Sequence, residues 1–499
     1  MADRCSGIPR RALLRRAAGV AGVAATGAVL GPAALAAPTR GAQRIVLVWR
    51  PWYAASTRTL PFLQRGIAPF LQEHPGVDVQ PVLSPQLGGM IPYMLAGDAP
   101  DVFQDWVLPG YVSDGLVLDL NPYIQRDNVD LSIFPSQEIN FFREVSSFGG
   151  TPGALYFLPC YIHTQTIVVN QTALDDMGLP YPDPQGMPWA DWARSFRSWT
   201  VRSANPKTQR FGGMPDWLGY NDSSYNFLSP YYLYGNGGGY VTPGNPTSSQ
   251  LGSPATTAFA TEYMDLFQAG VLGWGNFATG QNVSAISGTG SGISSVVPFW
   301  RGFKWDYYPP PVFPVHQAAY SATDAHGIWN GTKYPELAWE FFKFLSIEPT
   351  WARFMMKLQL RGPGQKALWE EWAAVVSQVV PLLARKNLAA LTHGPLNDLT
   401  YPGHLFRYGD TEVRSAMATT FGQFSTTAGK PGTGAGADVT GALTSLAKQI
   451  NAIQVTGKAA DQSAVASLKR FRQVSPRCRS GRPTPTRRPR ARGSACRRP

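Results

Sequence analysis

Apolar and polar residues alternate with two different periods along the first part of the chain. Residues 44–49, RIVLVW, form a compact apolar run that is typical of a buried strand. Residues 59–73 place apolar side chains at helical spacing, and the turn His74-Pro75-Gly76 ends that predicted helix. Residues 77–82 then alternate like a strand. A strand, a helix and a second strand of these lengths form a βαβ unit, so we expect a parallel sheet with covering helices.

The segment 97–124, GDAPDVFQDWVLPGYVSDGLVLDLNPYI, predicts the next strand and helix. Asp101-Val102-Phe103 indicates a short buried strand, and the helix after it is expected to stop at a glycine. Asp105 and Trp106 follow that strand. Because ligands of open α/β sheets bind outside the carboxyl ends of the strands, these two residues are candidates for ligand contact. The alternative is that Trp106, like Tyr111 in the helix, is an ordinary core aromatic.

Further helices are predicted where apolar residues recur at helical spacing. They cover residues 256–269, 335–346, most of 350–391, and 442–453. Residues 306–315 contain three consecutive prolines and are expected to be extended. Residues 235–253 are rich in Gly, Pro and Ser and are predicted to be a loop, and residues 429–436 have the composition of a flexible linker.

The first 36 residues have the pattern of an export signal. Residues 10–16, RRALLRR, precede an apolar run at residues 17–35, and Ala34-Leu35-Ala36 offers a small-residue cleavage site. Paired arginines followed by two leucines resemble a twin-arginine signal, which exports proteins that have already folded. An ordinary secretory signal and an uncleaved anchor are the alternatives. We expect an exported protein, in the periplasm or on the outer face of the cytoplasmic membrane.

Length and charge bound the body of the chain. Its 499 residues are too many for one compact core, which predicts two domains or large lobes. The formal net charge of +12 comes from the two ends, since residues 1–44 carry +6 and residues 476–499 carry +9, which leaves −3 for residues 45–475. The basic total is therefore no reason to expect a nucleic-acid partner. Residues 456–499 are predicted to be a disordered basic tail, with an arm that touches an anionic surface as the alternative.

Cysteine usage and a search for motifs limit the chemistry further. Of the four cysteines only Cys160 lies in the body, so no internal disulfide framework is expected. The sequence has no nucleophile elbow, phosphate loop or HExxH motif, and no cluster of Cys and His with metal-ligand spacing. We therefore expect no metal site, no cofactor and no enzyme activity. The paired carboxylates of a glycoside hydrolase stay open, because Asp and Glu are scattered along the chain.

Four separated segments occur in an order that resembles a known family. They are FLQEHPGVDVQPV (70–82), GDAPDVFQDWVLPGYVSDGLVLDL (97–120), LYFLPCYIHTQTIVVNQTAL (155–174) and NGTKYPELAWEFFKFL (330–345). Together they resemble the extracellular solute-binding proteins of ABC importers, specifically the family 1 sugar-binding proteins that include the maltose-binding type. The resemblance covers roughly residues 45–455 and is thin between 200 and 300.

This resemblance implies an α/β fold of the periplasmic-binding-protein type. The fold has two lobes, each a sheet flanked by helices, and a hinge with several chain crossings. Carried onto this chain, lobe 1 covers residues 45–158 plus 316–350, and lobe 2 covers residues 159–315 plus 351–455. Leu158-Pro159 then lies at the first crossing, where a proline limits the backbone. The lobes are expected to close around a ligand by a hinge motion.

A sugar ligand needs flat aromatic surfaces against its C–H faces and polar groups for its hydroxyls. Residues of both kinds stand where the resemblance places the cleft: Trp52, Asp105, Trp106, Tyr161, His163, Tyr231, Tyr232, Trp300 and Arg301. Structural roles are the alternatives. His163 could be a structural histidine, and Arg301 could form a surface ion pair. Tyr231 and Tyr232 are adjacent, so only one of them is expected to face a ligand.

These features predict the substrate-binding component of an ABC-type importer, which captures a sugar or oligosaccharide by hinge closure. The expected partners are a small-molecule solute, namely a sugar, and the membrane permease of the transporter. The protein is expected to be a monomer. Two alternatives stay open: an extracytoplasmic carbohydrate-active hydrolase, and a binding protein for a non-sugar solute such as a glycerophosphodiester or polyamine. A polyamine would need several acidic groups, and a phosphoester would need a helix N-terminus plus an arginine, for which Arg301 is the candidate.

Overall fold

A computed structural model of the chain describes residues 44–51, 59–83, 90–105, 109–205, 207–214, 230–290, 292–403, 406–422 and 438–474. Trp52 and Trp106, two of the predicted ligand contacts, lie outside these residues, and so does the predicted export signal. Contacts group the chain from Ile45 onward into one unit. In the described part of the chain, no helix is both long enough and apolar enough to cross a membrane.

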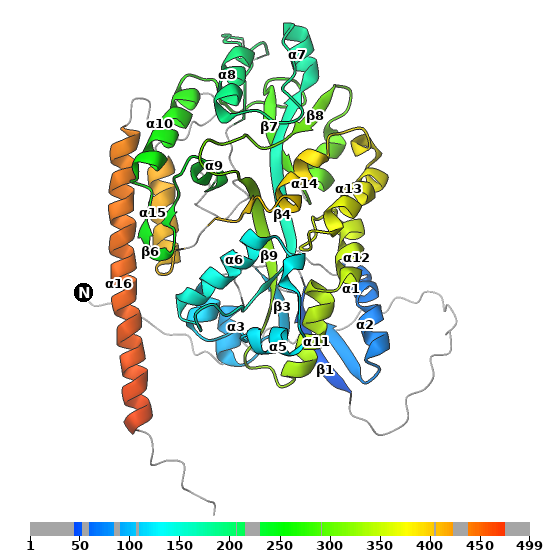
Figure 1. The fold of residues 1–499 in the computed structure, drawn as a ribbon, viewed down its shortest axis with the longest axis vertical. Helices are drawn as coiled ribbons and strands as arrows, with labels where there is room; N and C mark the ends of the chain where they lie inside the picture. The colour runs from blue at the N-terminus through cyan, green and yellow to red at the C-terminus, as the bar shows by residue number, and fades with distance from the viewer. Residues whose placement is uncertain are drawn as a thin grey trace, which may run out of the picture. The chain divides into compact units, whose positions relative to one another are not determined.

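One mixed sheet of eight strands organises the described chain (Figure 1). Its strands are β1 (Ile45–Arg50), β2 (Val77–Pro81), β3 (Val102–Asp105), β4 (Leu158–Asn170), β7 (Ser284–Gly288), β8 (Trp305–Tyr308), β9 (Ala319–Ile328) and β10 (Thr400–Tyr401). β1 is parallel to β2 and β3, as the βαβ pattern predicted. β9 is antiparallel to both β3 and β4, and β4 also pairs with β7 and β8. A separate pair, β5 (Val241–Thr242) and β6 (Asn245–Ser249), lies in the region predicted to be a loop.

Helices connect and cover these strands. They are α1 (Leu60–Gly66), α2 (Ala68–Glu73), α3 (Ile91–Ala96), α4 (Pro109–Ser113), α5 (Asn121–Arg126), α6 (Ser136–Val145), α7 (Gln171–Met177), α8 (Trp189–Trp199), α9 (Pro230–Gly235), α10 (Pro254–Gln268), α11 (Pro335–Ser346), α12 (Pro349–Gln359), α13 (Leu368–Val379), α14 (Ala389–Leu396), α15 (Asp410–Gly422) and α16 (Val439–Val474). α11 has the bounds that the sequence predicted.

Two helical predictions need correction. The helix expected over residues 59–73 is divided at Ile67 into α1 and α2, and Pro69 stands in the first turn of α2, where a missing N–H costs nothing. The helix expected over residues 442–453 belongs to the much longer α16, so residues 456–474 are helical where we expected disorder.

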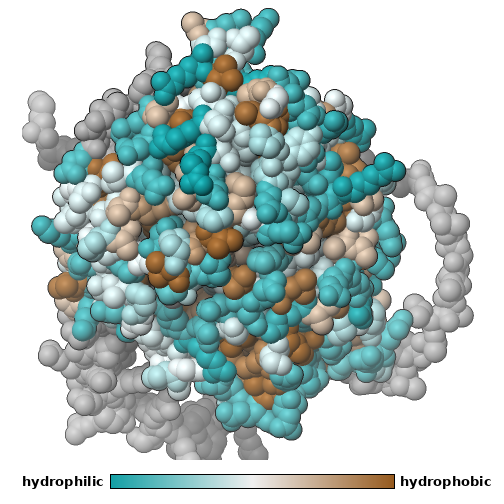
Figure 2. Space-filling model, turned by 45° about the horizontal axis from the view of Figure 1, so that its top comes forward, coloured by the Kyte–Doolittle hydropathy of each residue, from teal (hydrophilic) through white to brown (hydrophobic). Residues whose placement is uncertain are grey.

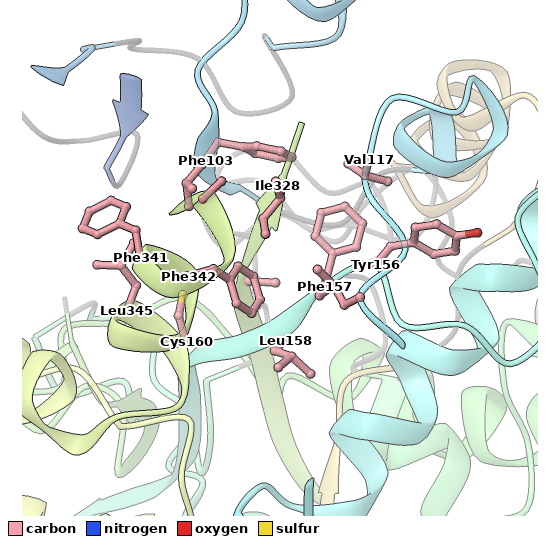
Figure 3. Packing of buried hydrophobic residues seen from close by; sticks show 14 of the residues in the cluster. Phe103, Val117, Tyr156, Phe157, Leu158, Cys160, Ile328, Phe341, Phe342 and Leu345 are labelled. Atoms are coloured by element: carbon pink, nitrogen blue, oxygen red, sulfur yellow. The ribbon is translucent and has the colours of Figure 1, made fainter. Parts of the chain in front are cut away.

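A first core lies around β1, β3 and the start of β4. It gathers buried side chains from residues 47–161 and from residues 325–355. α11 supplies Phe341 and Phe342 to it, close to Phe103 of β3 and Cys160 of β4 (Figure 3). The Trp49 ring of β1 lies 5.5 Å from the Phe341 ring, in an edge-on contact. Segments that lie far apart in the sequence thus build one core.

A second group of buried residues forms two further clusters. One gathers aromatic and aliphatic residues of α8, α9, α10, α15 and the first half of α16. The other packs α12, α13 and α14 against the middle of β4 and against β8. Both take residues from β4, namely Ile167 and Ile162 respectively, and we refer to them together as the second core.

β4 and β9 connect the first core with the second core. The two strands lie side by side in Figure 1, paired from Leu158 with His326 to Gln165 with Tyr320, with a register shift between Pro159 and Tyr161. β4 then continues past β9 to pair with β7 and β8. Both cores therefore include residues of one continuous sheet, and the predicted crossing at Leu158-Pro159 stands at the start of β4.

Candidate functional site

One face of β4 changes from apolar to polar and back along its length. Alternate residues of a strand share a face, so Tyr161, His163, Gln165 and Ile167 lie on one side of β4. Tyr161 is buried in the first core and Ile167 in the second core, whereas His163 and Gln165 are only partly buried. Two polar side chains therefore stand between two apolar cores.

β9 extends this polar strip across the sheet. His163 is opposite Ala322 and Gln165 is opposite Tyr320, and residues directly opposite in a ladder share a face. The Tyr320 ring lies edge-on to the His163 ring, at 6.2 Å between centroids, and 6.1 Å from the Tyr231 ring. An aromatic surface thus borders the polar side chains.

His163 is held at both of its ring nitrogens. Its Nε2 lies 3.0 Å from Nε2 of Gln165, and its Nδ1 lies 3.1 Å from Oγ1 of Thr289, which follows β7. Burial lowers the pKa of His163 to about 4, and the positive charge of Arg361 acts in the same direction. The ring is therefore neutral at neutral pH.

An ion pair flanks the histidine. Arg361, just after α12, pairs with Asp324 of β9, and Gln104 of β3 donates a hydrogen bond to the same carboxylate at 2.9 Å. The Arg361 guanidinium carbon lies 5.3 Å from the centre of the Tyr161 ring. The hydroxyl of Tyr161 accepts a hydrogen bond from Trp351 Nε1 at 3.0 Å, which fixes the ring. The guanidinium is thus placed by both a carboxylate and an aromatic face.

Together these residues form what we call the β4–β9 polar cluster: His163, Gln165, Thr289, Tyr320, Asp324 and Arg361. It sets hydrogen-bonding groups beside aromatic rings, and its two charged members are paired with each other. Such a surface suits a polar ligand that carries no strong charge of its own. Among the described residues, no group of three or more His, Cys, Asp and Glu side chains could hold a metal ion.

Asp105 lies in a buried network. Its Oδ2 is 3.0 Å from Nη1 of Arg50, and both side chains are fully buried. Tyr111 of α4 donates a hydrogen bond to the same oxygen at 2.6 Å. Burial raises the pKa of Tyr111 far above its ordinary value, and the Asp105 charge adds to the rise. Tyr111, which the sequence left undecided, is a core residue.

Tyr231 and Tyr232 are both buried in α9, each with 2–3% of its surface exposed. The Tyr232 ring packs against Trp189 and Phe259 of the second core, at 5.2 and 6.0 Å. Tyr231 is the one of the two whose ring reaches the β4–β9 polar cluster, through Tyr320. The structure thus separates two residues that the sequence could not distinguish.

Trp300 and Arg301 are placed elsewhere. Trp300 is buried in the second core, where its ring lies 4.6 Å from Phe277 and 5.1 Å from Trp305. Its carbonyl accepts a hydrogen bond from Trp305 Nε1 at 3.1 Å. Arg301 is exposed. Of the predicted contacts that are described, Tyr161, His163 and Tyr231 are therefore brought together, while Trp300 packs in a different part of the second core.

The sequence analysis missed Gln165, Thr289, Asp324 and Arg361. A signal for Gln165 was present, because HTQT (163–166) is a run of four polar residues within a strand that is otherwise apolar. Arg361 had no comparable signal. It joins the site only because the chain that follows α12 returns to β4, where Ile162 N–H bonds to the Gly362 carbonyl.

The chain was compared with models of known protein families. The model of the family described as "Bacterial extracellular solute-binding protein" matches residues 54–346, which is more than half of the chain. The chain belongs to this family. This confirms the family suggested by the four sequence segments.

Solved structures with the same fold bind sugars according to their descriptions. An ABC substrate-binding protein from Listeria monocytogenes in complex with cycloalternan aligns with a TM-score of 0.60 and 17% identity, over 82% of this chain and 98% of that one. A cyclic alpha-maltosyl-1,6-maltose binding protein from Arthrobacter globiformis gives 0.61 and 16%, over 84% and 100%. The sugar-binding protein MalE from Xanthomonas citri gives 0.61 and 14%, over 84% and 99%.

These alignments establish the fold of this solute-binding protein. They confirm the predicted α/β, two-lobed periplasmic-binding-protein-like architecture. At sequence identities of 14–17% these alignments show a shared fold and no more, so the ligand follows from the residues of this chain.

Proposed function

We propose that this protein is the substrate-binding component of an ABC importer and captures a sugar or oligosaccharide outside the cytoplasmic membrane. The observation that carries the proposal is the β4–β9 polar cluster, because half-buried hydrogen-bonding groups stand there between two apolar cores on strands common to both. A ligand held at this place contacts elements of both cores. Closure of the lobes about β4 and β9 would then enclose it.

The division into lobes is part of the proposal. The first core draws on residues 47–161 and 325–355, which supports a lobe 1 made of residues 45–158 plus 316–350. The second core supports a lobe 2 made of residues 159–315 plus 351–455. Movement of one lobe against the other then bends β4 and β9, which are the strands that carry the polar cluster.

The chemistry of the cluster favours an uncharged polyol. His163 is neutral, and Arg361 is paired with Asp324, so binding does not require a countercharge from the ligand. A sugar presents hydroxyls to such groups and C–H faces to rings such as that of Tyr161. We propose Tyr161 and His163 as ligand contacts.

The other predicted contacts are also proposals. Trp52 and Trp106 would add aromatic platforms from outside the described residues. Asp105 would affect ligand binding through Tyr111, with which it is hydrogen-bonded. Tyr231 would affect it through the ring of Tyr320, with which it is in contact. For Tyr232, Trp300 and Arg301 the structure offers no support beyond their place in lobe 2.

The expected partner is the membrane permease of the transporter, with the protein exported to the periplasm or the outer face of the cytoplasmic membrane and acting as a monomer without enzyme activity. The surface is consistent with a monomer. On the face in Figure 2, apolar residues form small groups separated by hydrophilic ones, without one dominant apolar patch.

A ligand screen tests the proposal. The mature protein is heated with maltose, cycloalternan, D-tagatose and acarbose, and with spermidine and glycerophosphocholine as non-sugar solutes. A sugar that binds only the folded state raises the melting temperature by mass action, and calorimetry then gives its Kd. Chromatography of the same sugar after incubation should show it unchanged. Stabilisation by spermidine or glycerophosphocholine alone would replace the sugar assignment, and sugar cleavage would replace the binding protein by a hydrolase.

A further inference from the structure

Gln165 has a buried oxygen that no described residue satisfies. Its Oε1 is buried and has no hydrogen-bond partner in the part of the chain that the structure describes, while its Nε2 lies 3.0 Å from Nε2 of His163. Buried side-chain acceptors in folded proteins are normally paired with a protein group or an ordered water. This oxygen lies between the two cores, on the strand that carries the candidate site, so a ligand hydroxyl is a natural partner for it.

A chain of hydrogen bonds joins this amide to Thr289 through His163. The Gln165 NH2 group donates to His163 Nε2, so the proton of the neutral ring is on Nδ1 and is donated to Thr289 Oγ1 at 3.1 Å. Thr289 Oγ1 also accepts the backbone N–H of Thr164 at 3.1 Å, which holds the hydroxyl in place. In this orientation the NH2 group is used by the histidine, and the oxygen is the group left for a ligand.

Glycine leaves the space that this arrangement needs. A Cβ at Gly288 would lie 2.1 Å from the Thr164 carbonyl oxygen and 2.5 Å from Cγ of Gln165, so any other residue there would displace the β4 backbone as well as the glutamine side chain. Gly290 has a φ of 68°, and a Cβ there would lie 3.7 Å from Nδ1 of His163. The turn after β7 is thus shaped around the glutamine and the histidine.

We propose that Gln165 determines specificity at the solute site by accepting a hydrogen bond from one ligand hydroxyl, and that His163 and Thr289 position it. The inference rests on the proposed function and adds to it the residue that recognises the hydroxyl. An acceptor oxygen in this place excludes ligands that present an anionic oxygen, since two acceptors repel, and it penalises a ligand that lacks the hydroxyl.

The test compares variants in the full mature chain. The probe is whichever of maltose, cycloalternan and D-tagatose binds the unchanged protein most tightly. Gln165→Leu removes the acceptor, and the Kd of the probe should rise about tenfold or more. Gln185→Leu alters an exposed glutamine away from the site and serves as the matched control, with an unchanged Kd. The melting temperature of each variant without ligand shows whether it has folded.

Two further measurements separate recognition from a structural role. Thr289→Val should weaken binding several-fold, and Thr289→Ser, which restores the hydroxyl, should recover it. A series of deoxy analogues of the probe, each lacking one hydroxyl, is then measured. For one analogue, Gln165→Leu should bind the analogue and the parent sugar with equal Kd. The unchanged protein should bind that analogue more weakly than the parent sugar.

The outcomes are distinct. If Gln165→Leu folds and binds the probe with the Kd of the unchanged protein, an ordered water satisfies the oxygen and the specificity role is overturned, while the sugar-binding function stands. If Gln165→Leu does not fold, the deoxy analogues are measured with Thr289→Val instead. Loss of the difference in Kd between the parent sugar and the analogue supports the proposal, and a retained difference overturns it. If no sugar binds the unchanged protein, the proposed function fails and this inference fails with it.

Discussion

The buried network of Arg50, Asp105 and Tyr111 leads to a sharp prediction about stability. Asp105→Asn keeps an oxygen that can accept from Tyr111 but removes the charge that faces Arg50 at 3.0 Å. Both charged side chains are fully buried, so water cannot compensate the guanidinium. Breaking a buried pair by removing one partner typically costs about 3–5 kcal/mol. We expect Asp105→Asn to lower the free energy of unfolding by about 3 kcal/mol, a large part of the total for a typical protein.

Two further variants show where that cost arises. Tyr111→Phe removes a hydrogen bond to a charged acceptor and should cost about 1.5–3 kcal/mol. Arg50→Met combined with Asp105→Leu removes both charges together, so no unpaired ion stays buried, and this double variant should be more stable than Asp105→Asn alone. The free energies come from urea denaturation followed by tryptophan fluorescence, with the Tyr111→Phe/Asp105→Asn double variant to measure coupling.

The opposite pattern would refute this reasoning. If the free energy of unfolding of Asp105→Asn lies within about 0.5 kcal/mol of that of the unchanged protein, the buried pair contributes nothing to stability. That difference is the range of ordinary surface substitutions. If the same variant also loses sugar binding, Asp105 is a ligand contact, as its position after a strand first suggested. Comparing stability with affinity therefore decides between the two roles of this residue.

Three other changes have expected outcomes. Burial lowers the pKa of His326 from 6.5 to about 3, so the unfolded chain takes up a proton first as pH falls; this group alone should remove about 2 kcal/mol of stability from pH 7.5 to 5, and the loss measured in urea melts should be smaller by about that amount in His326→Asn. Gly212→Ala would push a methyl group into the Phe196 carbonyl, so soluble yield and melting temperature should fall sharply, and an unchanged melting temperature would contradict the packing. Trp52→Ala and Trp106→Ala should weaken sugar binding in calorimetry with the fold intact by circular dichroism; unchanged affinity in both would remove them from the site.

Local patterns were enough to predict much of the fold. The alternation in residues 44–82 predicted the first parallel strands, because side-chain periodicity is set by local backbone geometry. The apolar stripe of residues 335–346 predicted α11 with its bounds for the same reason. The extent of α16 was missed, because residues 456–474 were grouped with the basic, apolar-poor tail that follows them.

The site was less predictable, because it is made by contacts between distant segments. Asp324 lies in β9 and Arg361 follows the end of α12, so their ion pair joins two segments that are separate in the sequence. No local pattern predicts that pairing. Tyrosine is as common in cores as in binding sites, so the burial of Tyr232 could not be inferred from its type. His163 was identified because it follows the Leu158-Pro159 crossing, where the family resemblance places the cleft.

The composition of the first core also has a consequence for synthesis. Trp49, near the start of the body, meets Phe341 and Trp351, which leave the ribosome long after it. The N-terminal half of the nascent chain therefore holds exposed aromatic surface until about residue 355 has emerged, and its β4 strand waits as long for β9. Chaperones that bind apolar segments should associate with chains truncated before α11 and release those that extend past α12.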